Sequence, residues 1–207
     1  MFISSRLRLA ALTLVIVSAA APAFAGPPLI CHPFETRSGA LLPWGDAPQW
    51  KAPLASYAVA NLTGDLIKLL DAGAPVITRM ENMRRATIYA SKDPAIARQL
   101  LDAVMAKAAS AGGAQAWFDA GYLIESYRQA EAIREHRGPE WAAVDATLAD
   151  GGYRFVQKAM AMTGGPNAEM EFAASLMTQG TTASEHRARA AAAAVSGSAL
   201  AANLSKY

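Results

Sequence analysis

The stretch "PEWAAVDATLADGGYRFVQKAMAM", Pro139–Met162, carries the clearest structural signal in the 207-residue chain. Its apolar side chains recur three or four residues apart, at positions 141, 144, 148, 155, 159 and 162, which is the spacing of one face of an α-helix. A Gly-Gly-Pro break at 164–166 ends the pattern. We therefore predict a helix over about 139–162. At Gly151 and Gly152 we expect a kink or a close helix contact, because each glycine costs a helix about 1 kcal/mol relative to alanine.

Segments of the same kind fill the rest of the chain from residue 54 onward. Their predicted starts fall near 54, 75, 94, 114, 139, 167 and 182. Asp93 followed by Pro94 is typical of a helix start, and Thr182 with Glu185 forms a capping-box pattern. Alternating runs of β-branched residues are missing from the sequence. We therefore predict one all-α domain over 54–207, with about seven helices packed as antiparallel hairpins in a short repeat stack or a bundle.

Two segments precede this domain. Residues 1–25 combine Arg6 and Arg8 with an apolar run at 9–21 and small residues at 23 and 25, which predicts a signal peptide cut after Ala25. The apolar run of about 13 residues is shorter than the roughly 20 that span a bilayer, so we expect no transmembrane anchor after cleavage. The predicted localisation is periplasmic or secreted.

Residues 26–53 contain six prolines and little periodic pattern, which predicts an extended strap packed across the helices. Apolar residues in this segment are expected to anchor it: Leu29, Ile30, Phe34, Leu42 and Trp44.

The charge balance limits the partners. Two of the 19 basic residues and none of the 17 acidic residues lie in the leader, so 17 of each remain after cleavage. No block of like charge stands out, and nucleic acid is therefore not an expected partner. A single cysteine excludes an intramolecular disulfide.

That cysteine, Cys31, stands next to His32, a combination typical of a thiol nucleophile with its base or of two metal or haem ligands. Pro33 favours an extended backbone at His32, where neighbouring side chains point to opposite sides. A base for Cys31 would then have to be His136 or His186. A packed thiol is the favoured interpretation, metal or haem binding and thiol catalysis remain as alternatives, and no cofactor is expected.

The segment "AWFDAGYLIESY", Ala116–Tyr127, resembles the first helix of a tetratricopeptide repeat. Trp117 and Gly121 match the family's tryptophan and glycine, whereas Ala120 replaces its leucine and Ile124 its tyrosine. The later positions of the repeat do not match. The resemblance implies stacked helical hairpins with a groove that binds a peptide. Four aromatic residues are candidates for lining such a groove, with core packing as the favoured alternative: Trp117, Tyr122, Tyr127 and Trp141.

A second resemblance concerns "LIESY", Leu123–Tyr127, which is similar to the segment of lytic transglycosylases that carries a catalytic glutamate followed by serine. "SLMTQG" at 175–180 is similar to their Gly-Leu-Met-Gln segment, although it lies farther downstream than in that family. The resemblance implies Glu125 as the acid that protonates a glycosidic oxygen. The alternative is a solvated residue paired with Arg128. Taken together, the sequence favours a non-enzymatic binding or scaffold module for a peptide, protein or cell-envelope partner over a peptidoglycan-acting lytic enzyme or a metal- or haem-binding protein.

Overall fold

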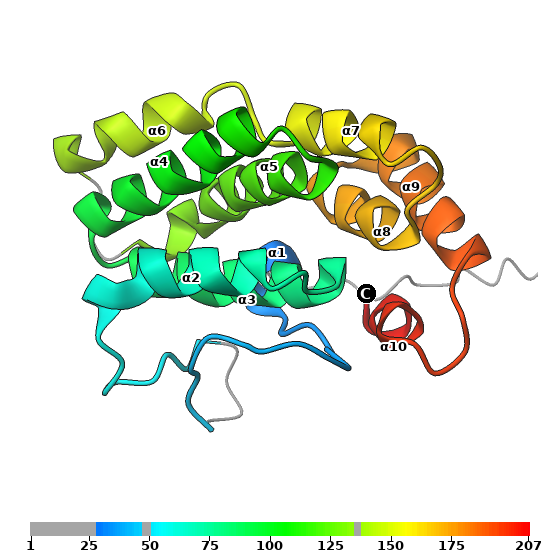
Figure 1. Cartoon of the computed structure of the whole chain (residues 1–207), viewed down its shortest axis with the longest axis horizontal. Coiled ribbons are helices and arrows are strands. Elements are labelled where there is room, and N and C mark those ends of the chain that lie inside the picture. Colours follow the sequence, from blue (N-terminus) through cyan, green and yellow to red (C-terminus); the bar gives the residue numbers. More distant parts are fainter. Residues whose placement is uncertain (1–27, 47–50, 135–137) are drawn as a thin grey trace, which may run out of the picture.

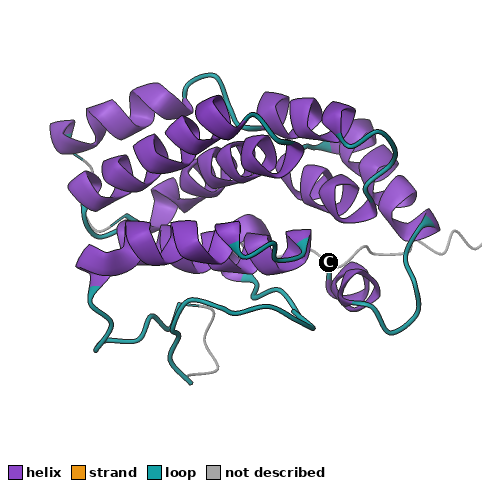
Figure 2. Cartoon of the chain, viewed as in Figure 1, coloured by secondary structure: helices purple, strands orange, loops and turns teal. Residues whose placement is uncertain are grey.

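The computed structural model describes residues 28–46, 51–134 and 138–207, so the predicted signal peptide lies outside the described residues. The described part consists of helices and loops without a strand, which confirms the all-α prediction (Figure 1, Figure 2). None of its helices combines the length and apolar character needed to cross a membrane. The α-helices are α1 (Pro28–Cys31), α2 (Leu62–Asp71), α3 (Val76–Ala90), α4 (Pro94–Ala111), α5 (Ala114–Gln129), α6 (Ala142–Leu148), α7 (Tyr153–Met162), α8 (Ala168–Met177), α9 (Gly180–Ala192) and α10 (Ala199–Lys206). Short 3-10 turns are η1 (Val59–Asn61), η2 (Ala130–Ile133) and η3 (Pro139–Trp141).

Helix α5 is the centre of the fold. It packs mainly against α3, α4 and α7, and α8 and α9 form a hairpin that α10 contacts at one end of the molecule (Figure 1). On α5, Phe118, Tyr122 and Leu123 are 0 % exposed. Removing such large apolar side chains from water is the main favourable contribution to the stability of a fold of this kind.

Helix starts follow local chemistry where a cap is present. The Asp93 side chain accepts the N–H groups of Ala95 (2.8 Å) and Ile96 (3.3 Å), as predicted for the start of α4. The predicted capping box at Thr182 is wrong, because only residues 178 and 179 separate α8 from α9 and α9 already begins at Gly180.

Two other predicted boundaries are also wrong. The first long helix begins at residue 62 rather than 54, because the backbone N–H of Leu54 is held outside it by the Tyr89 hydroxyl of α3 (2.8 Å). The last predicted helix is two helices. It stops at Ala192, and Ser198 caps α10 by accepting the N–H of Ala201 (3.1 Å).

The glycine pair divides the predicted helix over 139–162. Gly151 has a φ of +72°, a left-handed conformation that ends α6 and its turn before α7 begins. Gly152 lies directly against Gly121 of α5, where a Cβ atom on Gly121 would come within 2.5 Å of the Gly152 carbonyl oxygen. The predicted close contact is confirmed, whereas the continuous helix is wrong, because the chain breaks between α6 and α7 instead of kinking.

The strap begins with a turn of helix, α1, which the expectation of an extended segment did not include. This turn forms because it buries Leu29 and Ile30 completely. Of the other predicted anchors, Phe34 and Leu42 are buried and Trp44 is half-buried against the core.

Polar side chains of α3 hold the backbone of the strap. Glu81 accepts the N–H of Phe34 (3.0 Å), while Asn82 accepts the N–H of Leu42 (2.8 Å) and donates to the carbonyl of Ala40 (3.0 Å). Buried backbone groups need such partners. The bonds to the strap explain why α3 carries polar side chains and is nevertheless almost entirely buried.

Helix α10 closes over the strap from the other end of the chain. Asn203 accepts the N–H of Glu35 (3.0 Å) and donates to its carbonyl (2.9 Å). The Tyr207 ring stacks on that of Phe34, with centroids 5.4 Å apart, and its hydroxyl donates to the carbonyl of His32 (2.7 Å). The first and last described segments are thereby joined.

Candidate functional site

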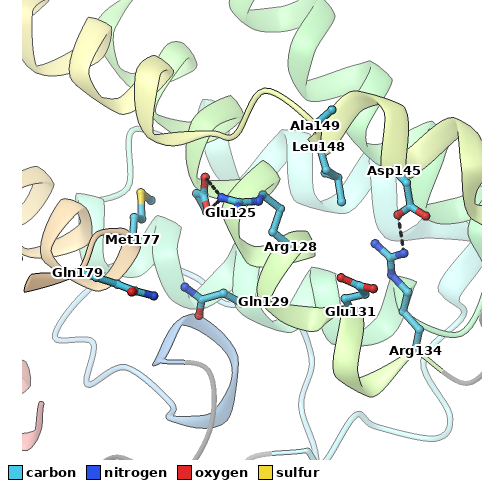
Figure 3. A pocket seen from close by; sticks show the side chains of 10 residues that line it. All are labelled: Glu125, Arg128, Gln129, Glu131, Arg134, Asp145, Leu148, Ala149, Met177 and Gln179. Carbon is cyan, nitrogen blue, oxygen red and sulfur yellow. Dashed lines mark hydrogen bonds and ion pairs between the residues drawn. The ribbon is translucent and has the colours of Figure 1, made fainter.

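A charged cleft of about 580 Å³ opens beside the C-terminal end of α5 (Figure 3). Its walls come from α5, η2, α6 and the junction between α8 and α9. The lining residues are Glu125, Arg128, Gln129, Glu131, Arg134, Asp145, Leu148, Ala149, Met177 and Gln179.

One wall is built on Glu125. Its Oε1 atom accepts the N–H of Gly152 (2.7 Å), and both carboxylate oxygens accept Nη1 of Arg128 (2.9 and 2.8 Å). The close approach of α5 and α7 at Gly121 brings the Gly152 amide within reach. The Glu125 side chain is only 4 % exposed, whereas that of Arg128 is 52 % exposed. The pairing expected from the sequence is present, but Glu125 is a buried residue and not a solvated one.

The other wall is built on Arg134. Its Nη1 atom donates to Asp145 (2.6 Å), and its guanidinium lies 4.5 Å from the centre of the Trp141 ring, a cation–π contact. The burial is reversed here, because the arginine side chain is 4 % exposed and the aspartate 54 %. The Nη2 atom of Arg134 is buried and has no hydrogen-bond partner among the described residues. A smaller cavity of about 230 Å³ adjoins this wall.

The Gln129 amide fixes the floor between the two walls. Its Oε1 atom accepts the N–H of Leu29 (2.8 Å), and its Nε2 atom donates to the carbonyl of Leu176 (3.2 Å). The cleft is therefore tied to α1 and to the end of α8, and its shape depends on the strap being in place.

None of the four aromatic candidates is among the residues that line the cleft. Tyr122, Tyr127 and Trp141 are 0–2 % exposed, which supports the core alternative for these three residues. Trp117 is half-buried and stacks on Phe155 of α7, with ring centroids 5.4 Å apart. Of the four, Trp141 alone borders a cavity near the cleft, where its ring supports the Arg134 guanidinium.

Cys31 and His32 sit under the end of α10. Burial raises the pKa of the Cys31 thiol, with Arg84 acting in the opposite direction, while burial and Arg84 both lower the pKa of His32. A guanidinium beside both groups disfavours a bound cation. Among the described residues, no group of three or more histidine, cysteine, aspartate or glutamate side chains is placed to hold a metal ion.

The two predicted alternative bases lie elsewhere. His136 is outside the described residues. His186 on α9 has its Nε2 atom 2.6 Å from the Tyr153 hydroxyl and its Nδ1 atom 2.5 Å from Glu171. Burial raises the pKa of Tyr153, which keeps its hydroxyl protonated. This chain of contacts ties α7, α8 and α9 together.

An ion pair with both partners buried, Arg79 and Asp119, was not predicted from the sequence. Arg79 of α3 donates to Asp119 of α5 (2.6 Å) and also to the carbonyl of Leu70 at the end of α2. Burial raises the pKa of Asp119 to about 7, against the lowering effect of Arg79. Because the arginine also satisfies a helix-end carbonyl, the pair joins three helices.

Sequence reasoning also missed Arg134 and Asp145. The one clue is the break at Gly138 and Pro139 between them, which folds the chain back. Comparison with protein-family models, with curated proteins and with solved structures finds no match to this chain. What the cleft can bind therefore follows from its own side chains.

Proposed function

We propose that this chain is an exported, non-enzymatic module that binds a peptide-bearing component of the cell envelope in the cleft of Figure 3. The observation that carries the proposal is that the cleft is preformed. Glu125, Gln129 and Arg134 are each held by hydrogen bonds or ion pairs to neighbouring elements. Side chains fixed in this way lose little freedom on binding, so more of the contact energy appears as affinity.

Two expectations from the sequence give the ligand class. The predicted leader at 1–25 favours the cell envelope, and the tetratricopeptide-like segment at 116–127 favours peptides. The chemistry of the cleft supports binding, since its lining offers paired charges and amides, which suit a polar ligand.

Filling the cleft tests this function. Ala149 lines the cleft and Ala146 does not, and both are exposed alanines of the same segment. The immobilised mature chain and its Ala149→Trp and Ala146→Trp variants would be exposed to peptides from a peptidoglycan digest and from periplasmic extract, with retained peptides identified by mass spectrometry. We expect the same peptide class on the parent and on Ala146→Trp and its loss on Ala149→Trp. Equal retention by all three would refute the proposal.

A lytic enzyme is the second candidate, and one observation favours it. Glu125, Met177 and Gln179, from the two segments similar to lytic transglycosylases, line the same cleft. Against it, both Glu125 oxygens accept hydrogen bonds from donors, whereas a general acid must carry a proton toward its substrate. Muropeptide release from peptidoglycan by the parent chain, and its loss in Glu125→Gln, would establish this candidate in place of simple binding.

The predicted export is tested by a separate measurement. Amino-terminal sequencing of the protein recovered from the periplasm or medium of an expressing bacterium should begin at Gly26. A chain that stays in the cytoplasm with Met1 in place would remove the cell envelope from the proposal.

A further inference from the structure

The two ion pairs of the cleft differ in which partner is buried, the acid or the base. In the pair of Glu125 and Arg128 the carboxylate is buried and the guanidinium is 52 % exposed. In the pair of Arg134 and Asp145 the guanidinium is buried and the carboxylate is 54 % exposed. The cleft therefore presents an accessible cation on one wall and an accessible anion on the other, and Figure 3 shows the two pairs separated along it.

Each accessible charge is held by a fixed partner. Glu125 is anchored by the Gly152 amide, and Arg134 by the face of the Trp141 ring. Arg128 donates to Glu125 through Nη1, so its Nε and Nη2 atoms remain able to donate hydrogen bonds to a ligand's oxygen atoms. A guanidinium with open donors is well suited to a carboxylate.

The two exposed charges narrow the class of ligand. A polyanion or phosphate would be repelled by the exposed Asp145 carboxylate, whereas a ligand with both a carboxylate and an ammonium group satisfies both walls. A volume of about 580 Å³ suits an amino acid or a peptide of a few residues.

We propose that the cleft binds a zwitterionic amino acid or short peptide with free ends, its carboxylate on Arg128 and its ammonium on Asp145. This inference rests on the proposed function and specifies the ligand for the same site. The buried partners, Glu125 and Arg134, keep the two exposed groups apart and oriented.

Alanine peptides test the charges separately. Alanine, Ala-Ala and Ala-Ala-Ala would be titrated into the mature chain by NMR at low salt, beside forms that are acetylated, amidated or both, and beside inorganic phosphate. We expect each cap to weaken binding of the best peptide by about tenfold or more, because each removes a charge-assisted contact. The series also gives the spacing of the two contacts.

Two variants identify which side chain binds which end of the peptide. In Arg128→Gln the free and amidated peptides should bind alike, and in Asp145→Asn the free and acetylated peptides should bind alike. Each substitution keeps a polar amide opposite its buried partner, Glu125 or Arg134, and circular dichroism would verify that each variant is folded. The exposed pair of Arg98 and Asp102 on α4 provides matched controls, Arg98→Gln and Asp102→Asn, which should leave binding unchanged.

The possible outcomes distinguish a failure of this inference from a failure of the proposed function. If the doubly capped peptide binds as tightly as the free one and Ala149→Trp abolishes both, peptide binding stands and the zwitterion inference fails. If phosphate competes as well as the free peptide, the site is a simple anion site and the inference fails. If no alanine peptide binds while cell-wall peptides are still captured, the inference fails alone; if neither binds, both fail.

Discussion

Replacing Gly152 by alanine tests the contact that fixes α7 on α5 and places the amide that holds Glu125. A Cβ atom on Gly152 would overlap the Gly121 carbonyl oxygen and lie 2.8 Å from its carbonyl carbon. These are backbone atoms, so no side-chain rotation relieves the overlap and the helices must separate. Overpacking of this kind costs about 1–3 kcal/mol, and a weakened bond to Glu125 adds about 1 kcal/mol. Alanine also reduces the conformational entropy of the unfolded chain, which offsets this loss by about 0.4–1 kcal/mol.

The expected net loss in the free energy of unfolding is therefore about 1–3.5 kcal/mol, measured by urea unfolding followed by circular dichroism. Gly64 gives a matched control, since it is exposed on α2 and a Cβ there meets nothing within 4 Å. Gly64→Ala should stabilise by up to about 1 kcal/mol. A Gly152→Ala protein within about 0.5 kcal/mol of the parent, which is the range of ordinary surface substitutions, would mean that α5 and α7 do not meet as described.

Three further outcomes follow from burial. Because the folded-state pKa of Asp119 is raised to about 7, its stabilising contribution is complete below the unfolded value near 3.8 and is lost as pH rises toward 7. The stability of the parent relative to Asp119→Asn should thus fall between pH 4 and 7, by at most about 1.4 kcal/mol per pH unit, and a difference that stays constant would contradict the shift. Asn203→Ala leaves the backbone groups of Glu35 without partners and should cost about 2 kcal/mol in urea unfolding; an unchanged midpoint would show that this clasp is dispensable. Cys31, with its raised pKa and partial burial, should react with a thiol reagent at pH 8 more slowly in the folded chain than in urea; equal rates would contradict the packing of the strap on the helices.

Local chemistry made much of the fold predictable. Asp93 caps its helix because its carboxylate needs only the nearby amides of Ala95 and Ile96. Four of the five strap anchors are buried, as expected for the apolar residues of a proline-rich segment. The glycine pair was predicted as a kink or a close contact; the close contact is present, and the helix breaks there instead of kinking. Helix boundaries failed where a distant group decides the local conformation, as when Tyr89 holds the N–H of Leu54.

The candidate site was predictable only in part. Glu125 was singled out by its segment, but its burial depends on the approach of Gly152, which no local pattern encodes. Arg134 and Asp145 meet only after the chain folds back between η2 and η3. The aromatic candidates illustrate the opposite problem, because the spacing that turns Tyr122 toward a groove also turns it toward a core.

The clasp between α10 and the strap joins residues about 170 positions apart, as in the bonds from Asn203 to Glu35 and from Tyr207 to His32. The ribosome makes Asn203 and Tyr207 about 170 residues after the strap, so this closure must wait until α10 has been synthesised. Until then α3 holds the strap without α10 across it, and the chain is kept from reaching its final, locked state early.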